Sequence, residues 1–311
     1  MNEREQYVWV EKYRPTKIED IVLPNVVKKQ LRGIIKKGEL TNLLFYGNVG
    51  CGKTTCAKAI PEELGFDYMF INGKNCGIDT ARHTLPQYAT ALSFDNNNRK
   101  IIIIDEAEKM SDDFGKALQT FIEEYADNCA FILTTNHPNQ LSSAIRSRFN
   151  DVCFDITNKD EKKVLFSTFK TKVLEILDKE GITYDSKVVA RFIFDYFPDM
   201  RKSLNMLQSY SNDNEIDIGI LAKRDSEFDE LLKLLKAREF RPMIDFIKES
   251  ELDFMKVSNY FINMIDKFDN INTAMMIKMI NEYDYKNAFV VHKQANLLAF
   301  LTEVISEVTI P

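Results

Sequence analysis

The segment Gly47-Asn48-Val49-Gly50-Cys51-Gly52-Lys53-Thr54 fits the phosphate-loop pattern GxxxxGK[ST]. It follows a short apolar run, residues 43–46, and precedes a stretch with helical character. Glycines let backbone N–H groups curl around phosphate oxygens, the lysine brings a charge to the outer phosphates, and the threonine offers a hydroxyl to Mg²⁺. This strand, loop and helix are therefore predicted to begin an α/β domain that binds a nucleotide.

A second motif is the apolar run 101–104, which ends in the acidic pair Asp105-Glu106. In a phosphate-loop protein, the first carboxylate at such a strand end holds Mg²⁺ and the second polarises the attacking water. An apolar strand with two acids is a weak signal alone, but it becomes strong when paired with the phosphate loop. The pair predicts hydrolysis of a nucleotide with Mg²⁺ rather than transfer to a small molecule.

Two further polar features follow the next apolar run. Asn136 ends that run and could reach the water at the γ-phosphate, while Arg146-Ser147-Arg148 lies on a predicted exposed loop or helix end. Each has an ordinary alternative: an asparagine that starts a turn before His137-Pro138, and a solvated basic cluster.

The first half of the chain alternates short apolar runs with helical patterns. Runs of four to six residues rich in β-branched and aromatic types are typical of strands buried on both faces. They cover residues 43–46, 68–72, 101–104, 130–135 and 152–154. Helical stretches between them predict a parallel sheet of the βαβ type.

Strands are expected to stop after about residue 156, where helical periodicity takes over. The pattern is clearest in residues 162–178, 188–197 and 200–210, and again from Phe228 to the last helix. We therefore predict an α/β domain over residues 1–155, a small helical domain over 156–225 and a third, all-helical domain over 226–311.

The composition sets further limits. With 45% hydrophobic and 28% charged residues, the chain of 311 residues has a globular composition. The sequence contains no run of about 18 apolar residues, so no membrane span is predicted. The N-terminal stretch lacks the apolar core of a secretion signal, so we expect a cytoplasmic protein. The net charge of −6 argues against a general basic coat for nucleic acid but leaves room for a local basic strip.

The order of several motifs carries a resemblance. Glu11-Lys12-Tyr13-Arg14-Pro15, the phosphate loop, Asp105-Glu106, Asn136 and Ser147-Arg148 occur in sequence as they do in the ATPase subunits of sliding-clamp loaders, within the AAA+ superfamily. Segments 68–73, 93–95 and 209–211 resemble the large subunits of T-even-type bacteriophages most closely. The likeness is good through residue 225 and rests on length and helicity alone beyond it.

The resemblance implies a RecA-like ATPase domain, a helical lid and a helical collar for oligomerisation. It implies ATP and Mg²⁺ as cofactors, with Thr54 and Asp105 on the metal. The nucleotide-binding residues that it implies are Arg14, Pro15, Gly47, Asn48, Val49, Gly50, Cys51, Gly52, Lys53, Thr54, Thr55 and Arg201. The catalytic residues that it implies are Lys53, Glu106, Asn136, Arg148 and Arg201, where Asn136 resembles the first sensor residue, Arg201 the lid arginine, and Arg148 the arginine that enters a neighbour's ATP site.

Two positions depart from the family pattern. Phe149 replaces the cysteine of the Ser-Arg-Cys motif, although the arginine is its chemical part. Gly115 stands where relatives often carry a glutamine that relays DNA binding to the ATP site, and Gln119 stands where they often carry arginine. The route by which DNA stimulates hydrolysis is therefore left open.

The segment Gly77-Ile78-Asp79-Thr80-Ala81-Arg82 is the candidate DNA contact. Asp79 or Thr80 is expected to cap a helix whose N-terminal amides face a phosphate, with Arg82 adding charge. In the family this helix lines the chamber for primer–template DNA, which implies Ile78, Asp79, Thr80 and Arg82 as DNA-binding residues. Its far end resembles the segment that plugs the clamp's hydrophobic pocket, which implies Leu85, Tyr88, Leu92 and Phe94. Ordinary core packing is the alternative for these four, and Pro86 is expected to kink or restart the helix.

The predicted function is that of an ATPase subunit of a sliding-clamp loader. Its implied partners are the sliding clamp, primer–template DNA, other copies of itself and a distinct small subunit in a pentameric ring, with no membrane involved. The alternative is another AAA+ DNA motor, such as a branch-migration helicase or a helicase loader. A non-catalytic scaffold is disfavoured by intact Lys53, Thr54, Asp105 and Glu106, and a small-molecule kinase has no use for Arg148 or the helical C-terminal part.

Overall fold

The computed structural model describes residues 7–38, 40–91, 100–211, 215–216, 219–250 and 252–310. The chain forms two compact units, Met1–Asp217 and Ile218–Pro311, and each is described by itself. Within the described ranges, no helix has both the length and the apolar character that a membrane span requires. The division into three domains, with boundaries after residues 155 and 225, stays a prediction.

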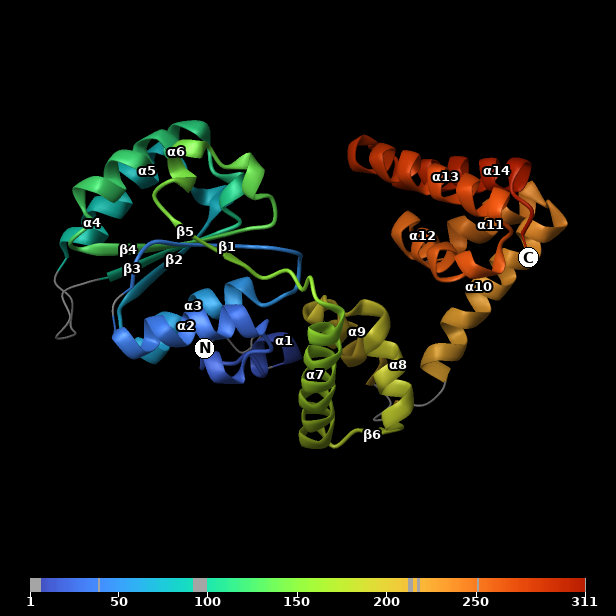
Figure 1. The fold of residues 1–311 in the computed structure, drawn as a ribbon, viewed down its shortest axis with the longest axis horizontal. Helices are drawn as coiled ribbons and strands as arrows, with labels where there is room; N and C mark the ends of the chain where they lie inside the picture. Colours follow the sequence, from blue (N-terminus) through green and yellow to red (C-terminus); the bar gives the residue numbers. More distant parts are fainter. Residues whose placement is uncertain are drawn as a thin grey trace. The chain divides into compact units, whose positions relative to one another are not determined.

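A five-stranded parallel sheet forms the centre of the described part of the first unit (Figure 1). Its strands are β1 (Leu43–Tyr46), β2 (Tyr68–Asn72), β3 (Lys100–Asp105), β4 (Cys129–Thr135) and β5 (Asn150–Cys153). The spatial order is β2-β3-β4-β1-β5. The prediction that the five apolar runs form a parallel sheet is confirmed. Because all strands run in one direction, the segments that follow β1, β3 and β4 meet at the same edge of the sheet.

Helices cover both faces of this sheet, which explains the unbroken apolar runs. Successive side chains on a strand point to opposite faces: Ile101 and Ile103 pack in one core cluster, and Ile102 and Ile104 in another. The first cluster lies under α2 (Asn25–Lys37) and α3 (Lys53–Leu64), and the second under α4 (Leu85–Thr90), α5 (Asp112–Glu124) and α6 (Ser143–Arg146) (Figure 1).

Three helices complete the first unit after the sheet: α7 (Lys159–Glu180), α8 (Ser186–Tyr196) and α9 (Met200–Tyr210). The short helix α1 (Trp9–Lys12) packs against α9, where the backbone N–H of the buried Trp9 donates to Gln208 Oε1 at 2.9 Å. Tyr13 donates its hydroxyl hydrogen to Glu180 at the end of α7. The N-terminal segment is thus fastened to the helical part of this unit.

One expectation about this region is wrong. The sequence predicts no strand after residue 156, yet β6 (Thr183–Tyr184) and β7 (Glu215–Ile216) pair in parallel. Each strand has two residues, which is too short to produce an apolar run or an alternating pattern.

The second unit is helical throughout its described residues. Its helices are α10 (Gly219–Ala237), α11 (Phe240–Glu249), α12 (Phe254–Asn263), α13 (Asn270–Phe289) and α14 (Lys293–Glu307). Their core contains Phe228, Leu231 and Leu235 from α10 and Leu297, Phe300, Leu301, Val304 and Ile305 from α14. Their spacing of three and four residues is the helical periodicity that the sequence shows from Phe228 onward.

Candidate functional site

A cavity of about 200 Å³ opens at the edge of the sheet where β1, β3 and β4 end. The helical part of the same unit contributes residues from α7 and α9 to its wall. Twelve predicted site residues line it: Arg14, Pro15, Val49, Gly50, Gly52, Lys53, Thr54, Thr55, Asp105, Glu106, Asn136 and Arg201. Gly47, Asn48, Cys51 and Arg148 are not among its lining residues. Segments far apart in the sequence therefore meet at one cavity.

The phosphate loop runs from the end of β1 to the start of α3. Gly50 adopts a φ of +74°, and a Cβ atom there would lie 1.8 Å from Oδ1 of Asp199. The N–H of Met200, at the start of α9, donates to the carbonyl of Gly50 at 3.2 Å. Glycine is required here both by the backbone conformation and by the close approach of α9.

Lys53 begins α3 and is buried, with an exposed fraction of 7%. Its ammonium donates hydrogen bonds to the carbonyl oxygens of Gly47 at 2.8 Å and Asn48 at 2.7 Å. No carboxylate in the described ranges forms an ion pair with it. A buried ammonium with neutral partners leaves its charge uncompensated, and the N-terminus of α3 adds to the positive potential. The loop thus fits an anionic phosphate group.

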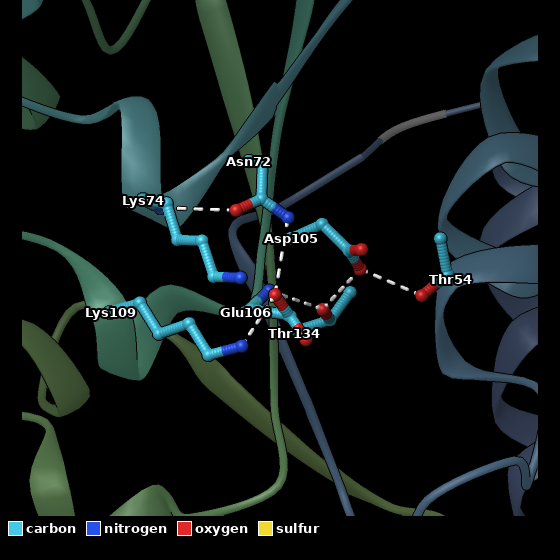
Figure 2. A network of polar contacts seen from close by, with 7 residues as sticks. All are labelled: Thr54, Asn72, Lys74, Asp105, Glu106, Lys109 and Thr134. Atoms are coloured by element: carbon cyan, nitrogen blue, oxygen red, sulfur yellow. Dashed lines mark hydrogen bonds and ion pairs between the residues drawn. The ribbon is translucent and has the colours of Figure 1, made fainter.

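The two predicted metal ligands lie side by side. Thr54 donates its hydroxyl hydrogen to Asp105 Oδ1 at 2.7 Å, and Thr134 donates to the same oxygen at 2.6 Å (Figure 2). Hydroxyl and carboxylate oxygens are the ligands that Mg²⁺ prefers, so the donor set fits this ion. Thr134 was missed by the sequence reasoning because only the pairing of Ile104 with Leu133 places it beside Asp105.

Glu106 is held by polar contacts from three directions (Figure 2). Its carboxylate accepts hydrogen bonds from Lys109 Nζ at 2.8 Å and Asn72 Nδ2 at 3.2 Å, and its N–H donates to Thr134 Oγ1 at 3.1 Å. The hydrogen bond from Lys109, followed by that from Asn72, lowers the pKa of Glu106. The carboxylate is therefore ionised at neutral pH, the state that a base for the attacking water requires.

The backbone of Glu106 is strained. Its φ is +56°, a left-handed value that non-glycine residues adopt rarely. The turn is crowded from the β2 side, because a Cβ atom at Gly73 would lie 2.2 Å from the carbonyl oxygen of Glu106. Strain of this kind costs on the order of 1–3 kcal/mol and is concentrated at functional sites.

Two arginines reach the cavity from outside the sheet. Arg14 donates from Nη1 to Thr55 Oγ1 at 3.0 Å and pairs with Glu11. Arg201 is exposed at the start of α9, where the Asp199 carboxylate caps the helix by accepting the N–H of Lys202 at 2.9 Å. Both positions are suited to a nucleotide that lies between the phosphate loop and α9.

Arg148 is placed differently from the other predicted catalytic residues. It follows α6, and its Nη2 atom pairs with Glu123 Oε1 at 2.6 Å. Its Nη1 atom donates to the carbonyl of Ala144. The guanidinium is therefore bound within its own chain and is not part of the cavity wall.

The candidate DNA segment differs in detail from the expectation. Arg82 is exposed, as a phosphate contact requires. The predicted capping role is wrong: Asp79 makes no side-chain cap hydrogen bond, and the Thr80 hydroxyl donates to the carbonyl of Asn75 at 3.0 Å. Asp79 already has helical φ and ψ angles, so the helix begins before it. A π-helical turn, Thr80–Thr84, continues into α4 with helical φ and ψ angles at Thr84 and Leu85, and Pro86 falls in the first turn of α4, so the helix does not restart at this proline.

Two predicted clamp contacts are packed into the core in this structure. Leu85 has no exposed surface, and the hydroxyl of Tyr88 is buried without a hydrogen-bond partner in the described part of the chain. Burial raises the pKa of Tyr88, and the ammonium of Lys100 lies 4.9 Å from the centre of its ring. Leu85 is thus a core residue, and Tyr88 is half-buried and packs against the same cluster, while a contact of either residue with a clamp stays a prediction. Leu92 and Phe94 lie outside the described residues.

Comparisons with known sequences identify two families along the chain. The model of the ATPase family associated with various cellular activities matches residues 43–155, and that of the AAA+ ATPase lid domain of sliding-clamp-loader large subunits matches residues 162–222. The sliding-clamp-loader large subunit of Enterobacteria phage T4 is 33% identical over 249 residues, which cover 78% of this chain and 77% of the relative. That of Escherichia phage RB69 is 31% identical over 220 residues, with 70% and 68% covered.

More distant relatives extend the likeness. The replication factor C small subunit of Methanocella arvoryzae is 28% identical over 283 residues, which cover 87% of this chain and 84% of the relative. Among solved structures, a RuvB mutant of Thermotoga maritima superposes with a TM-score of 0.55 at 18% identity, covering 80% of this chain and 85% of that one. At this identity, the structural likeness shows a shared fold alone.

Proposed function

This chain belongs to the sliding-clamp-loader large-subunit family of AAA+ ATPases, and from that premise we propose that its cavity binds and hydrolyses ATP with Mg²⁺ to load a ring-shaped clamp onto primer–template DNA. The observation that carries the proposal is the convergence of the phosphate loop, Asp105-Glu106, Asn136 and Arg201 on one cavity. ATP binding would assemble subunits that grip an open clamp. Hydrolysis would then release the closed clamp on DNA.

The proposed roles follow from the contacts of Lys53, Thr54, Asp105, Glu106 and Arg14 and, for Asn136, Arg201 and Pro15, from their place in the cavity wall. Lys53 would hold the outer phosphates, and Thr54 and Asp105 would hold Mg²⁺, which would supply charge neutralisation during phosphoryl transfer. The ionised Glu106 accepts a proton from the attacking water once it turns from Lys109 toward that water. Asn136 orients the water, and Arg201 contacts the phosphates from α9. Arg14 and Pro15 line the side of the cavity where the adenine would lie.

Arg148 acts on a different subunit. Since it is outside its own cavity and bonded to Glu123 and Ala144, it completes the ATP site of a neighbouring copy by exchanging Glu123 for the developing charge on the phosphoryl group. The proposed assembly is a pentameric ring that contains several copies of this chain and a distinct small subunit.

DNA and clamp contacts follow from the family. Arg82 is exposed and can contact a backbone phosphate without reading sequence. A few such contacts inside a chamber are compatible with the net charge of −6, and they would make DNA binding depend on salt.

The test is a reconstitution with the clamp and the remaining loader subunits of the same replication system. ATP hydrolysis is measured with clamp alone, with primed DNA alone and with both, and clamp retention on circular primed DNA is scored by gel filtration. We expect the rate of ATP hydrolysis to be highest when clamp and primed DNA are both present, and clamps to be retained on the DNA. With Lys53→Ala we expect no stimulated hydrolysis and no retained clamps. If neither clamp nor DNA changes the rate of hydrolysis and no clamps are retained, the proposed function is rejected. DNA branch migration in the same preparation would favour the other AAA+ motor.

A further inference from the structure

We propose that Asp155 is a positioning residue of the ATP site, which fixes the peptide group between Gly47 and Asn48 and, through that group, the ammonium of Lys53. The inference rests on the proposed ATPase function. It assigns a role to a residue outside the motifs of the sequence analysis and outside the lining of the cavity.

The topology brings Asp155 to the first turn of the phosphate loop. Strand β5 pairs with β1, and the ladder continues beyond β5 because the N–H of Phe154 donates to the carbonyl of Tyr46 at 2.8 Å. Tyr46 immediately precedes Gly47, just as Phe154 precedes Asp155. The carboxylate of Asp155 therefore lies beside the start of the loop, and its Oδ1 atom accepts the N–H of Asn48 at 2.8 Å.

The same peptide group is held at its other end by Lys53. The carbonyl of Gly47 and the N–H of Asn48 belong to one planar unit. Lys53 Nζ donates to that carbonyl at 2.8 Å, and to the next carbonyl, of Asn48, at 2.7 Å. Asp155 and Lys53 thus bind opposite ends of one peptide dipole. Rotation of this peptide would break the contact with Asp155 and move an acceptor away from the ammonium.

The loop sequence leaves room for this carboxylate. Gly47 adopts a φ of +142°, and a Cβ atom there would lie 3.0 Å from Asp155 Oδ1 and 3.2 Å from its backbone nitrogen. A larger residue at position 47 would push the carboxylate away from Asn48.

A carboxylate near a triphosphate also has a cost, because like charges repel. Lys53 lines the cavity and Asp155 does not, so we expect the organising contact to outweigh the repulsion. The hydrogen bond and the charge of Asp155 can be tested separately with two variants. Asn at position 155 keeps an oxygen that can accept from Asn48 and removes the charge, whereas Ala removes both.

The experiment compares Asp155→Ala, Asp155→Asn and the control Asp160→Ala, which changes an acidic residue that is exposed at the start of α7. Binding of a fluorescent ATP analogue is measured on the full chain, KM and kcat on the reconstituted loader, and melting temperature on each variant. Loss of the hydrogen bond from the Asn48 N–H, which fixes the peptide group, predicts that Asp155→Ala raises Kd and KM about tenfold. We expect kcat to change much less, and Asp155→Asn and Asp160→Ala to bind like the wild type.

Unchanged Kd in Asp155→Ala would overturn the inference, as would equal defects in Asp155→Ala and Asp155→Asn. A lower melting temperature of Asp155→Ala with wild-type nucleotide affinity would also overturn it, since the role would then be structural only. The outcome is separate from that of the proposed function. If the wild-type loader does not hydrolyse ATP, the proposed function is refuted. The affinity of each variant for the ATP analogue still tests the role of Asp155 in that case.

Discussion

The ATP cavity and the loop that carries Arg148 belong to one folded unit, but their basic residues differ in the partners that they have. In the cavity, Lys53 is buried with neutral carbonyl partners, so its charge is available to an anion at that place. On the loop, the half-buried Arg148 pairs with a carboxylate of its own chain, that of the exposed Glu123 near the end of α5. An exposed ion pair of this kind contributes about 0–1 kcal/mol and exchanges readily. This difference supports the proposal that Lys53 serves the nucleotide of its own chain, whereas Arg148 can exchange Glu123 for a group on a neighbouring copy.

The variant with the largest expected effect replaces Arg148. Arg148→Ala should bind ATP with unchanged affinity, because Arg148 does not line the cavity. Hydrolysis by the assembled loader should fall by roughly 10³–10⁵, the contribution of an arginine supplied in trans. Binding of a fluorescent ATP analogue and single-turnover hydrolysis measure the two effects, with Arg146→Ala as the neighbouring control. A parallel loss of ATP affinity would place Arg148 in its own site instead.

The variant with the next largest expected effect replaces Glu106, which lines the cavity. Glu106→Gln keeps the shape of the side chain and removes the charge that polarises water, so turnover should fall by roughly 10²–10⁴. ATP binding should survive, and the variant should hold clamp and DNA in a stalled complex that sedimentation detects. Turnover at the wild-type rate would remove Glu106 from the catalytic role.

The next prediction concerns the helix α4, which the family likeness assigns to the clamp and the structure packs into the core. Leu85 is fully buried, so Leu85→Ala should lower the free energy of unfolding by about 2–5 kcal/mol. Tyr88→Phe removes a buried hydroxyl that has no partner among the described residues and should leave stability unchanged or raise it. Thermal melting and clamp affinity are measured on both. A selective loss of clamp binding by Leu85→Ala, at unchanged melting temperature, would restore the docking interpretation.

The smallest effect tests a single surface contact. Arg82 is exposed, and removing one phosphate contact should reduce the slope of DNA affinity against salt by about one unit. Arg82→Ala should therefore weaken DNA-stimulated hydrolysis at low salt and leave basal hydrolysis unchanged. Titration with primed DNA at several salt concentrations measures this. An unaltered slope would show that Arg82 does not face DNA.

The sequence predicted those parts of the fold that local patterns determine. Strands buried on both faces produce continuous apolar runs, so β1 to β5 were located to within two residues. The phosphate loop and Asp105-Glu106 are contiguous motifs and could be read directly. Thr134, Asn72 and Asp155 could not, because each contacts the site across a strand pairing, and strand order is not a local property. Leu85 and Tyr88 show the converse limit, since apolar residues at helical spacing look alike whether they pack in a core or dock on a partner.

The central claim is that neighbouring copies of this chain complete each other's ATP sites. The most direct measurement mixes Arg148→Ala with Lys53→Ala, each nearly inactive alone, in assemblies that mass measurement shows to contain both. We expect hydrolysis to reappear, because an intact phosphate loop in one copy then meets an intact arginine from its neighbour. No recovery in demonstrably mixed assemblies, or full activity of the wild-type chain as a proven monomer, would contradict it.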